Sequence, residues 1–341
     1  MSFTLVKTLL DEYGTITRAR LETCLGSWQH DAGLYPLICD YPRRGGRMLR
    51  SGLCIAAARA FGAAIEDVID VAAAIELMHN AFLVHDDVED EAEQRRGQPS
   101  LNALHGVPAA VHAGDALAVL AFEPLLGLHR HLGPALTLRL LEETQRMARV
   151  SIEGQAMELA WRRDNRIALT DEDYLRLVLK KTCWYTTIYP MRVGALIGTR
   201  GNIDPDRFLH FGFFLGATFQ IQDDLLNLIG DPQRYGKEID GDLWEGKRTL
   251  MLIHLLGRAG TGERERLREI LGEPREQRSA DGVRWMRERM DAYGSIEHAQ
   301  RVAHALAGAA QHEFASACAG LPSSRDLAFI EKLPTWVISR A

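Results

Sequence analysis

The stretch SGLCIAAARAFGAAIEDVIDVAAAIELMHNAFLVHDD, residues 51–87, indicates the fold of this chain. It is rich in Ala, Leu and Ile, and Gly62 after Phe61 marks a break between two helices. The second helix is apolar on most of its faces, which is typical of a helix at the centre of a bundle. The stretch therefore predicts two hydrophobic helices, of which the second lies in the interior.

The helical pattern continues through most of the chain. Similar apolar periodicity occurs at about 108–129, 134–160, 171–200, 205–229 and 247–258. Helix starts are indicated by Pro108, Pro134, the TDED at 170–173 and Asp204-Pro205. The less regular segment 258–295 predicts a solvated helical hairpin. Because strand-like alternation is nearly absent, we expect an all-α fold, a single large helical bundle around a central cavity, in one domain over residues 1–341.

Composition narrows the class of function. Hydrophobic residues make up 46% and charged residues 25% of the chain, as in ordinary globular proteins. The net charge of -6 argues against nucleic acid as a partner. Five scattered cysteines without a CxxC pair predict reduced thiols and a cytoplasmic location. The N-terminus lacks a signal peptide's apolar core and no run of 18 or more uncharged apolar residues occurs, so we expect no transmembrane segment.

An acidic cluster follows the second of these helices, in LVHDDVEDEAEQRRGQP. Asp86 and Asp90 are four residues apart and share a helix face, while Asp87 lies about 100° round. Like charges on one face repel, and a divalent cation such as Mg²⁺, bridging to a diphosphate, would neutralise them. A solvated helix end has the same pattern, and for this cluster taken alone it is the commoner explanation.

A second cluster repeats this design in FGFFLGATFQIQDDLLNLIGD, where Asp223 and Asp224 follow an apolar helix. The two clusters are 137 residues apart, so they can act together only by facing each other across a bundle cavity. Gln220 and Gln222 interrupt the apolar run just before the acids. Buried polar groups require partners, and a bound ligand is a suitable one.

Basic residues lie near both clusters in the sequence: Arg47, Arg50, Arg95, Arg96, Lys181, Lys237 and Lys247. Each alone could be an ordinary surface cation. Arginine offers bidentate geometry to phosphate, and Gly45-Gly46 would let the backbone approach an anion closely. Carboxylates and cations together predict a negative ligand that is bound partly through metal and partly directly.

In this order, the motifs resemble those of the trans-isoprenyl (polyprenyl) diphosphate synthases, over about residues 40–255. The matching elements are Gly45-Gly46-Arg47 with Arg50 for GGKxxRP, Glu76-Leu77-Met78-His79 for ELIH, Asp86 to Asp90 for the first aspartate-rich motif, Arg95-Arg96-Gly97 for RRG, Gly154-Gln155 with Glu158 for GQxxE, Lys181-Thr182 for KT, Phe219-Gln220 with Asp223-Asp224 for FQxxDD, and Lys237, Asp242 and Lys247 in the trailing GK and EGKRT elements.

The resemblance implies an isoprenoid synthase type I fold, a homodimer and Mg²⁺-dependent prenyl transfer, with three Mg²⁺ per site and Mn²⁺ as a substitute. The substrates would be isopentenyl diphosphate and an allylic diphosphate (dimethylallyl, geranyl or farnesyl). The product would be a trans-prenyl diphosphate of the geranylgeranyl (C20) or farnesyl (C15) type. A longer-chain polyprenyl synthase, a class I terpene cyclase and a non-catalytic synthase subunit remain alternatives.

The same resemblance assigns roles to residues. The metal ligands would be Asp86, Asp90, Asp223 and Asp242, with Asp87, Asp224 and Asn227 as further candidates. The allylic diphosphate would be held by Arg95, Lys181, Lys237 and Lys247. Isopentenyl diphosphate would be held by Gly46, Arg47, Arg50, His79 and Arg96. The catalytic residues would be Lys181, Thr182, Gln220 and Lys237, with Thr182 and Gln220 beside the reacting carbons.

Three positions depart from the family pattern. Arg47 stands where Lys is usual and keeps the charge. Ser51 replaces the usual Pro, and we expect this change to touch only the local backbone. Asn227 gives DDxxN in place of DDxxD, which predicts weaker support for one metal ion.

Product length depends on residues before the first cluster. Phe82 is four residues before Asp86, about 6 Å deeper in the bundle, and Met78 is about 12 Å deeper. Ala81 leaves a gap where short-chain members of the family often carry an aromatic residue. Phe82 could gate the tail of the product or be an ordinary core residue, and the pattern favours short products.

Overall fold

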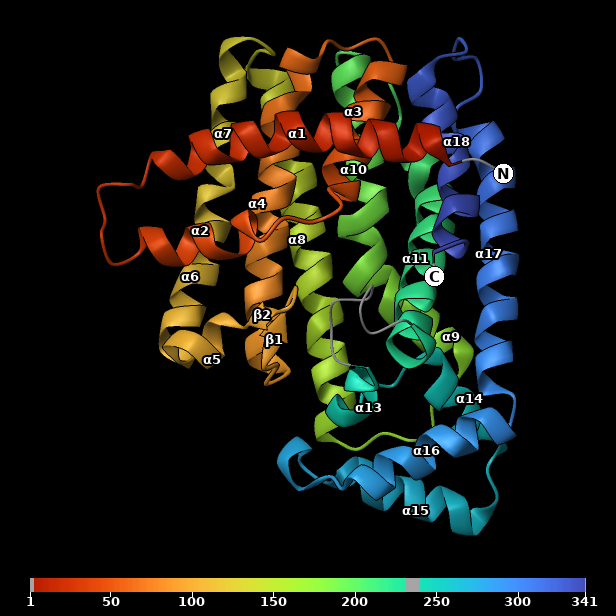
Figure 1. The fold of residues 1–341 in the computed structure, drawn as a ribbon. Helices are drawn as coiled ribbons and strands as arrows, with labels where there is room; N and C mark the ends of the chain where they lie inside the picture. The colour runs from red at the N-terminus through yellow and green to blue at the C-terminus, as the bar shows by residue number, and fades with distance from the viewer. Residues whose placement is uncertain (1–2, 231–238, 341) are drawn as a thin grey trace.

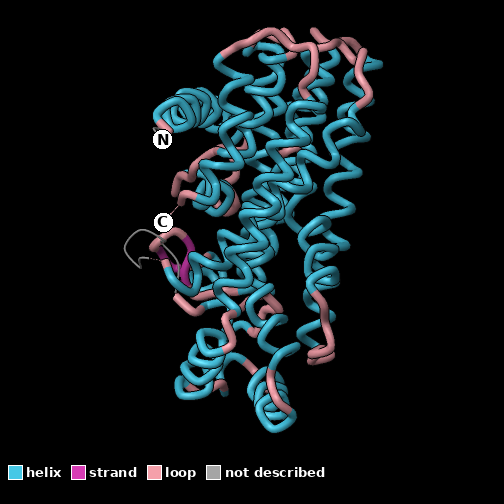
Figure 2. Tube along the Cα trace, turned by 90° about the vertical axis from the view of Figure 1, so that its right-hand side faces the viewer, coloured by secondary structure: helices cyan, strands magenta, loops and turns pink. Residues whose placement is uncertain are grey.

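The computed structural model describes residues 3–230 and 239–340, whose regular secondary structure is almost entirely helical, so the predicted all-α fold is confirmed. Figure 1 shows long helices side by side along one direction, and Figure 2 shows the same bundle as an elongated stack from the side. The elements before residue 131 are α1 (Thr4–Gly26), α2 (Tyr35–Arg43), α3 (Leu49–Ala60), α4 (Ile65–Glu89), β1 (Gln94–Arg95), β2 (Gln98–Pro99), α5 (Leu101–His105), α6 (Val107–Leu120), α7 (Phe122–Gly127) and a 3₁₀ turn (Leu128–Arg130).

The remaining elements complete the bundle. They are α8 (Pro134–Arg163), α9 (Asp171–Val178), a π-helix (Leu179–Ile188), α10 (Tyr189–Gly198), a 3₁₀ turn (Pro205–Phe208), α11 (Leu209–Ile229), α13 (Gly241–Glu245), α14 (Leu250–Arg258), α15 (Thr261–Gly272), a 3₁₀ turn (Arg275–Gln277), α16 (Ala280–Ala292), α17 (Ser295–Ala317) and α18 (Arg325–Ile338). The helices α15 and α16 lie across one end of the bundle in Figure 1, which confirms the helical hairpin predicted for 258–295.

Helix α4 is the central scaffold of the site. The break predicted at Phe61-Gly62 is confirmed, because α3 ends at Ala60 and α4 begins at Ile65. The helices α1, α3, α6 and α7 all pack against α4, and its buried residues extend from Val68 to Asp87. Each large aliphatic side chain buried in this way contributes about 1.5–3 kcal/mol. The acids at the end of α4 are therefore carried on a rigid support.

The helical segment predicted over 171–200 is confirmed, and it runs without a break through α9, the π-helix and α10. The π-helix contacts α8 and α11 closely. A Cβ atom on Gly154 of α8 would lie 2.3 Å from the backbone nitrogen of Lys181, and one on Gly216 of α11 would lie 2.8 Å from Cys183 Cα. Only glycine allows these approaches, which bring Lys181 between the two neighbouring helices.

Within residues 3–230 and 239–340, two segments are long and apolar enough to cross a membrane by length and composition alone: Ile65–Glu89 and Val107–Arg130. The first is the central helix α4, whose most apolar window is 72% buried inside the protein, whereas the second is 50% buried. Core helices pass the same test. The absence of a transmembrane segment stays a prediction.

Candidate active site

A cavity of about 780 Å³ lies between α4, α8, the π-helix and α11. Asp86 of α4 lines it, and so do Asp223 and Asp224 of α11 and Asp242 of α13. The two acidic clusters, which are far apart in the sequence, thus open into the same space. This was the central geometric requirement of the sequence interpretation.

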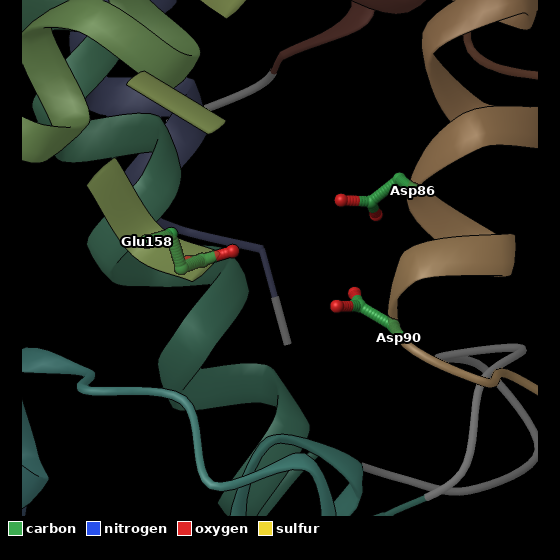
Figure 3. A group of neighbouring side chains, drawn as sticks. All are labelled: Asp86, Asp90 and Glu158. Atoms are coloured by element: carbon green, nitrogen blue, oxygen red, sulfur yellow. The ribbon is translucent and has the colours of Figure 1, made fainter. Parts of the chain in front are cut away.

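Three carboxylates gather beside this cavity, of which Asp86 and Glu158 line it and the buried Asp90 does not. Asp86 and Asp90 point from the end of α4 towards Glu158 of α8, as Figure 3 shows, and one oxygen from each lies within 4.8 Å of the others. Three converging carboxylate oxygens are a donor set that suits a hard divalent cation. Sequence analysis gave Glu158 no role, although its place in the GQxxE-like element, one helical turn after Gly154, was the available signal.

Cations from other elements balance this cluster. Lys181 Nζ lies 3.2 Å from Asp86 and also donates to Glu158. Lys247 Nζ lies 2.7 Å from Asp90, and Arg162 lies 2.8 Å from the other oxygen of Asp90. Such compensation is needed because α4 ends here and its dipole places negative partial charge beside the acids.

The protonation of these groups follows from their neighbours. Burial alone would raise the pKa of Asp86, but the charges of Lys181, Lys247 and Arg95 outweigh it and hold this pKa well below the usual range. Burial would lower the pKa of Lys181, but Asp86 and Glu158 raise it well above the ordinary value. At neutral pH Asp86 is therefore an anion and Lys181 a cation.

Asp87 occupies a different environment from Asp86 and Asp90. It is fully buried, it accepts a hydrogen bond from the hydroxyl of Tyr41 at 2.5 Å, and it accepts two from Arg95 Nε at 2.9 and 3.0 Å. The same guanidinium lies 3.7 Å from Asp86. Asp87 thereby orients Arg95 towards the cavity, and it is not one of the residues that line the cavity.

In the second cluster, Asp224 is held by neutral donors. Asp224 accepts hydrogen bonds from the hydroxyl of Tyr174 at 2.7 Å and from the amide of Gln220 at 2.6 Å. The amide oxygen of Gln220 in turn accepts a hydrogen bond from Thr182 at 2.8 Å. Burial raises the pKa of Asp224 to about 6, although both hydrogen bonds act in the opposite direction. These contacts bring Thr182 and Gln220 next to each other. They are the two residues expected beside the reacting carbons.

Asn227 belongs to the support of a turn. Its side-chain oxygen accepts the backbone N–H of Asp242 at 3.1 Å, and its carbonyl accepts the backbone N–H of Asp240 at 2.9 Å. Asp242 lines the cavity 3.8 Å from Lys247. Asn227 therefore positions Asp242. The predicted contacts of Lys237 lie outside the described residues.

Three of the residues expected to hold isopentenyl diphosphate line the cavity: Arg50, His79 and Arg96. Arg50 Nη1 lies 3.3 Å from His79 Nε2, and Arg96 donates to the carbonyl of Tyr41 at 2.9 Å. Gly46 has a φ of 156°, and a Cβ atom there would lie 3.1 Å from the Arg96 guanidinium. Arg47 is exposed and is not among the lining residues.

Two polar residues have partners other than those that the sequence indicated. Ser51 was expected to affect only local backbone, and this is wrong: its N–H and hydroxyl both donate to Glu76, 25 residues away, at 3.2 and 2.8 Å. Proline has no N–H to make the first of these bonds. Gln222, for which a ligand was suggested, donates to the carbonyl of Arg340 at 2.8 Å.

The apolar part of the cavity extends from the acids along α4. Met78, Ala81 and Phe82, the residues expected to limit the product, all line it. The sequence gave no indication of the facing wall, which includes Ala118 of α6 and Phe122 of α7. His85 lies 3.3 Å from Asp115 at the acidic end, so Phe122, seven residues after Asp115, is about 10 Å deeper.

A helical bundle whose cavity has acids and cations at one end and apolar walls at the other defines an enzyme that binds a diphosphate with a hydrocarbon tail. The sequence matches the family described as Polyprenyl synthetase over residues 33–289, and the chain belongs to this family.

The relatives agree with this assignment. The chain is 34% identical to "Short chain isoprenyl diphosphate synthase" of Methanothermobacter thermautotrophicus, with 76% of this chain and 77% of that protein covered. The crystal structure of geranylgeranyl pyrophosphate synthetase from Pyrococcus horikoshii is similar, with a TM-score of 0.85, 28% identity and coverage of 99% and 98%. So is polyprenyl synthase from Caulobacter crescentus complexed with calcium and isoprenyl diphosphate, with a TM-score of 0.83, 28% identity and coverage of 98% and 97%. The protein is a prenyltransferase that condenses isopentenyl diphosphate with allylic diphosphates.

Proposed function

We propose that this prenyltransferase is Mg²⁺-dependent and makes a short product, geranylgeranyl diphosphate (C20) first and farnesyl diphosphate (C15) second. The observation that carries the proposal is the single cavity, which joins acids and cations at one end to an apolar pocket at the other. The apolar wall from Phe82 to Phe122 gives the tail a bounded space. The name of the short-chain relative supports the same product class.

The metal would be held by the acids at one end of the cavity. Asp86, Asp90 and Glu158 converge within 4.8 Å, and Asp223 and Asp242 face the same space. These oxygen donors fit Mg²⁺, which we propose binds as three ions and can be replaced by Mn²⁺. When bound, Mg²⁺ would supply Lewis-acid stabilisation to the leaving oxygens of the allylic diphosphate.

The chain's own residues would then carry the reaction. Lys181, Lys247 and Arg95 hold the allylic diphosphate and stabilise the negative charge that develops as its carbon–oxygen bond breaks. The apolar wall excludes water from the allylic cation that remains. The double bond of isopentenyl diphosphate attacks this cation, and the proton that is lost passes to the departing diphosphate.

A separate group of residues would position isopentenyl diphosphate, the second substrate. Arg50, His79 and Arg96 lie at the cavity and would bind the diphosphate of isopentenyl diphosphate. The hydrogen-bonded pair Thr182 and Gln220 lies beside the reacting carbons in this arrangement. Two fixed diphosphate sites would hold the reacting carbons close and in line.

Chromatography of the products tests this proposal. Purified protein is supplied with Mg²⁺, isopentenyl diphosphate and each allylic starter in turn, and we expect C20 as the longest main product. A main product of C40 or longer would contradict the short-chain assignment. Turnover of the allylic diphosphate alone would indicate a cyclase, and inactivity of the purified chain by itself would indicate a synthase subunit.

Phe82→Ala tests the limit of the tail pocket. Phe82 lies four residues from Asp86, and its side chain lines the cavity. Its removal should lengthen the products by at least one isoprene unit, because the tail can then extend past residue 82. An unchanged product profile would remove Phe82 from the limiting residues.

The assembly is proposed from the exposed apolar surface. Several large hydrophobic side chains on α5, α6 and α7, along one edge of the bundle in Figure 1, are exposed: Leu104, Val107, Val111, Val119 and Leu126. Exposed apolar patches of this kind mark interaction surfaces. We propose that two chains form a homodimer through this edge. Each chain of 341 residues would be a single domain, and the protein would be cytoplasmic. Light scattering of purified protein would test the dimer.

A further inference from the structure

Tyr185 of the π-helix lies between the residues proposed to bind isopentenyl diphosphate and a residue proposed to limit the product tail. Its hydroxyl accepts a hydrogen bond from Arg50 Nη2 at 2.9 Å. Its ring stacks on His79 with centroids 5.9 Å apart and meets Phe82 edge-to-face at 5.6 Å. All four side chains line the cavity. One residue thus contacts both Arg50 and His79, which are expected to bind isopentenyl diphosphate, and the aromatic residue expected at the product tail.

We propose that Tyr185 is a positioning and specificity-determining residue that joins these two functions. The proposal rests on the function proposed above for Arg50 and His79. The hydroxyl fixes the Arg50 guanidinium for isopentenyl diphosphate, and the ring fixes Phe82 as a wall of the tail pocket. Neither task was assigned from the sequence, where Tyr185 follows the KT element by three residues.

The first task follows from how Arg50 is held. Its guanidinium lies 4.4 Å over the Tyr185 ring, so one side of the cation is covered by that aromatic face. Nη2 is fixed by the Tyr185 hydroxyl and Nη1 lies against His79. Nε is buried and has no hydrogen-bond partner in the described part of the chain. A buried donor left in this way is ready for an anionic acceptor.

The second task follows from the edge-to-face contact. The rings of Tyr185 and Phe82 are inclined by 85°, a preferred geometry for aromatic pairs. Phe82 is only partly buried and borders the cavity, so its ring has room to turn if this neighbour is lost. A smaller residue at 185 should therefore open the pocket at the depth of residue 82.

Two substitutions separate the two tasks. Tyr185→Phe removes the hydroxyl and keeps the ring, so the KM for isopentenyl diphosphate should rise about tenfold, the effect of losing one hydrogen bond to a charged group. The KM for the allylic substrate and the product length should not change. Tyr185→Leu removes both, so it should raise the same KM and also lengthen the main product by at least one isoprene unit. If the Leu variant does not fold, Tyr185→Met tests the effect of losing the ring on product length.

Tyr189→Phe is the matched control. Tyr189 lies one helical turn further along, is buried and hydrogen bonds to Thr144 at 2.6 Å, but does not line the cavity. Its loss should lower thermal stability and leave both KM values and the product unchanged. A rise in the KM for isopentenyl diphosphate in this control as large as in Tyr185→Phe would show that the effect is merely structural.

The outcomes also separate this inference from the proposed function. Arg50→Ala is measured in parallel, and it should raise the KM for isopentenyl diphosphate more than Tyr185→Phe does. If Arg50→Ala has no effect, the proposed isopentenyl diphosphate site is wrong. If Arg50→Ala has its effect and Tyr185→Phe leaves that KM unchanged, the positioning role of Tyr185 is overturned. An unchanged product profile in folded Tyr185→Leu or Tyr185→Met overturns its role in specificity.

Discussion

The ends of α4 and α11 carry nearly the same sequence pattern, but the partners of Asp224 on α11 differ in kind from those of Asp86 and Asp90 on α4. Asp86 and Asp90 face charged side chains from other elements, including Lys181 and Lys247. In the second cluster Asp224 is held by the neutral groups of Tyr174 and Gln220. Asn227 accepts the backbone N–H of Asp242.

This difference indicates two roles: the acids of α4 act through their charge, whereas Asp224 and Asn227 hold neighbouring groups in place. Acids paired with lysines and arginines interact strongly and over a long range. A metal cation can take the place of the basic side chain beside the acid, and a diphosphate can take the place of the acid beside the basic side chain. Acids and amides held by hydroxyl and amide groups are committed to fixing the shape of the site. We therefore expect substitutions at the end of α4 to affect catalysis most, and substitutions around Asp224 and Asn227 to affect positioning and stability.

Asp86→Ala should have the largest effect. It removes one of the three converging carboxylates, so kcat should fall by roughly three orders of magnitude. The fold should stay intact, because Glu158 still pairs with Lys181 and one negative charge at the end of α4 is lost. Steady-state kinetics with circular dichroism measures both. The exposed Asp281 on α16 provides the control Asp281→Ala, and full activity of Asp86→Ala would count against the metal site.

Glu158→Gln tests the residue of this cluster that sequence analysis left without a role. The loss of its charge should lower kcat by about 10- to 100-fold and raise the Mg²⁺ concentration needed for half-maximal rate. The matched control is Glu153→Gln, on the same helix, where Glu153 pairs with Lys180 at 2.9 Å on the outer side. Equal effects of the two substitutions would show that Glu158 acts only through the general charge of α8.

The sequence predicted the parts of this comparison that depend on local pattern. The helical fold followed from the apolar periodicity of 51–87 and its neighbours, and the acids followed from their spacing. It could not show which acid faces a cation, because Lys181, Arg162 and Lys247 reach α4 from elements distant in the chain. The π-helix gave no signal either, since it depends on packing against Gly154 and Gly216.

Ser51 shows why the rest could not be predicted. Its two hydrogen bonds to Glu76 join α3 to α4 and arise only when both helices are packed. A residue compared with a family pattern can be judged for charge and size, but its partner is known only from the tertiary structure.

Asn227 gives a smaller and more specific test of the second region. Asn227→Ala removes the acceptor for the Asp242 N–H, so it should lower the free energy of unfolding by about 1–3 kcal/mol. The Mg²⁺ requirement should also rise several-fold, because the turn that carries Asp242 is loosened. Chemical denaturation and Mg²⁺ titration of the rate measure the two effects.

Asn227→Asp is the informative control for that substitution. A carboxylate oxygen can accept the same N–H, so stability should stay close to that of the natural protein. If Asn227→Asp instead improved Mg²⁺ binding tenfold or more, Asn227 would be a weakened metal ligand, as the sequence first suggested, and the supporting role would be wrong.

Tyr174→Phe should have the smallest effect and tests the comparison most directly. It removes one of the two hydrogen bonds to Asp224, leaving Gln220 to hold the carboxylate. The free energy of unfolding should fall by about 1–2 kcal/mol, because a buried acceptor loses its donor. The kcat should fall less than about fivefold. Tyr293→Phe, which removes a surface hydrogen bond to Glu263, is the control for loss of a hydroxyl. A fall in kcat as large as that of Asp86→Ala would mean that Asp224 takes part in the chemistry itself, and the division between the catalytic acids of α4 and the supporting Asp224 would no longer hold.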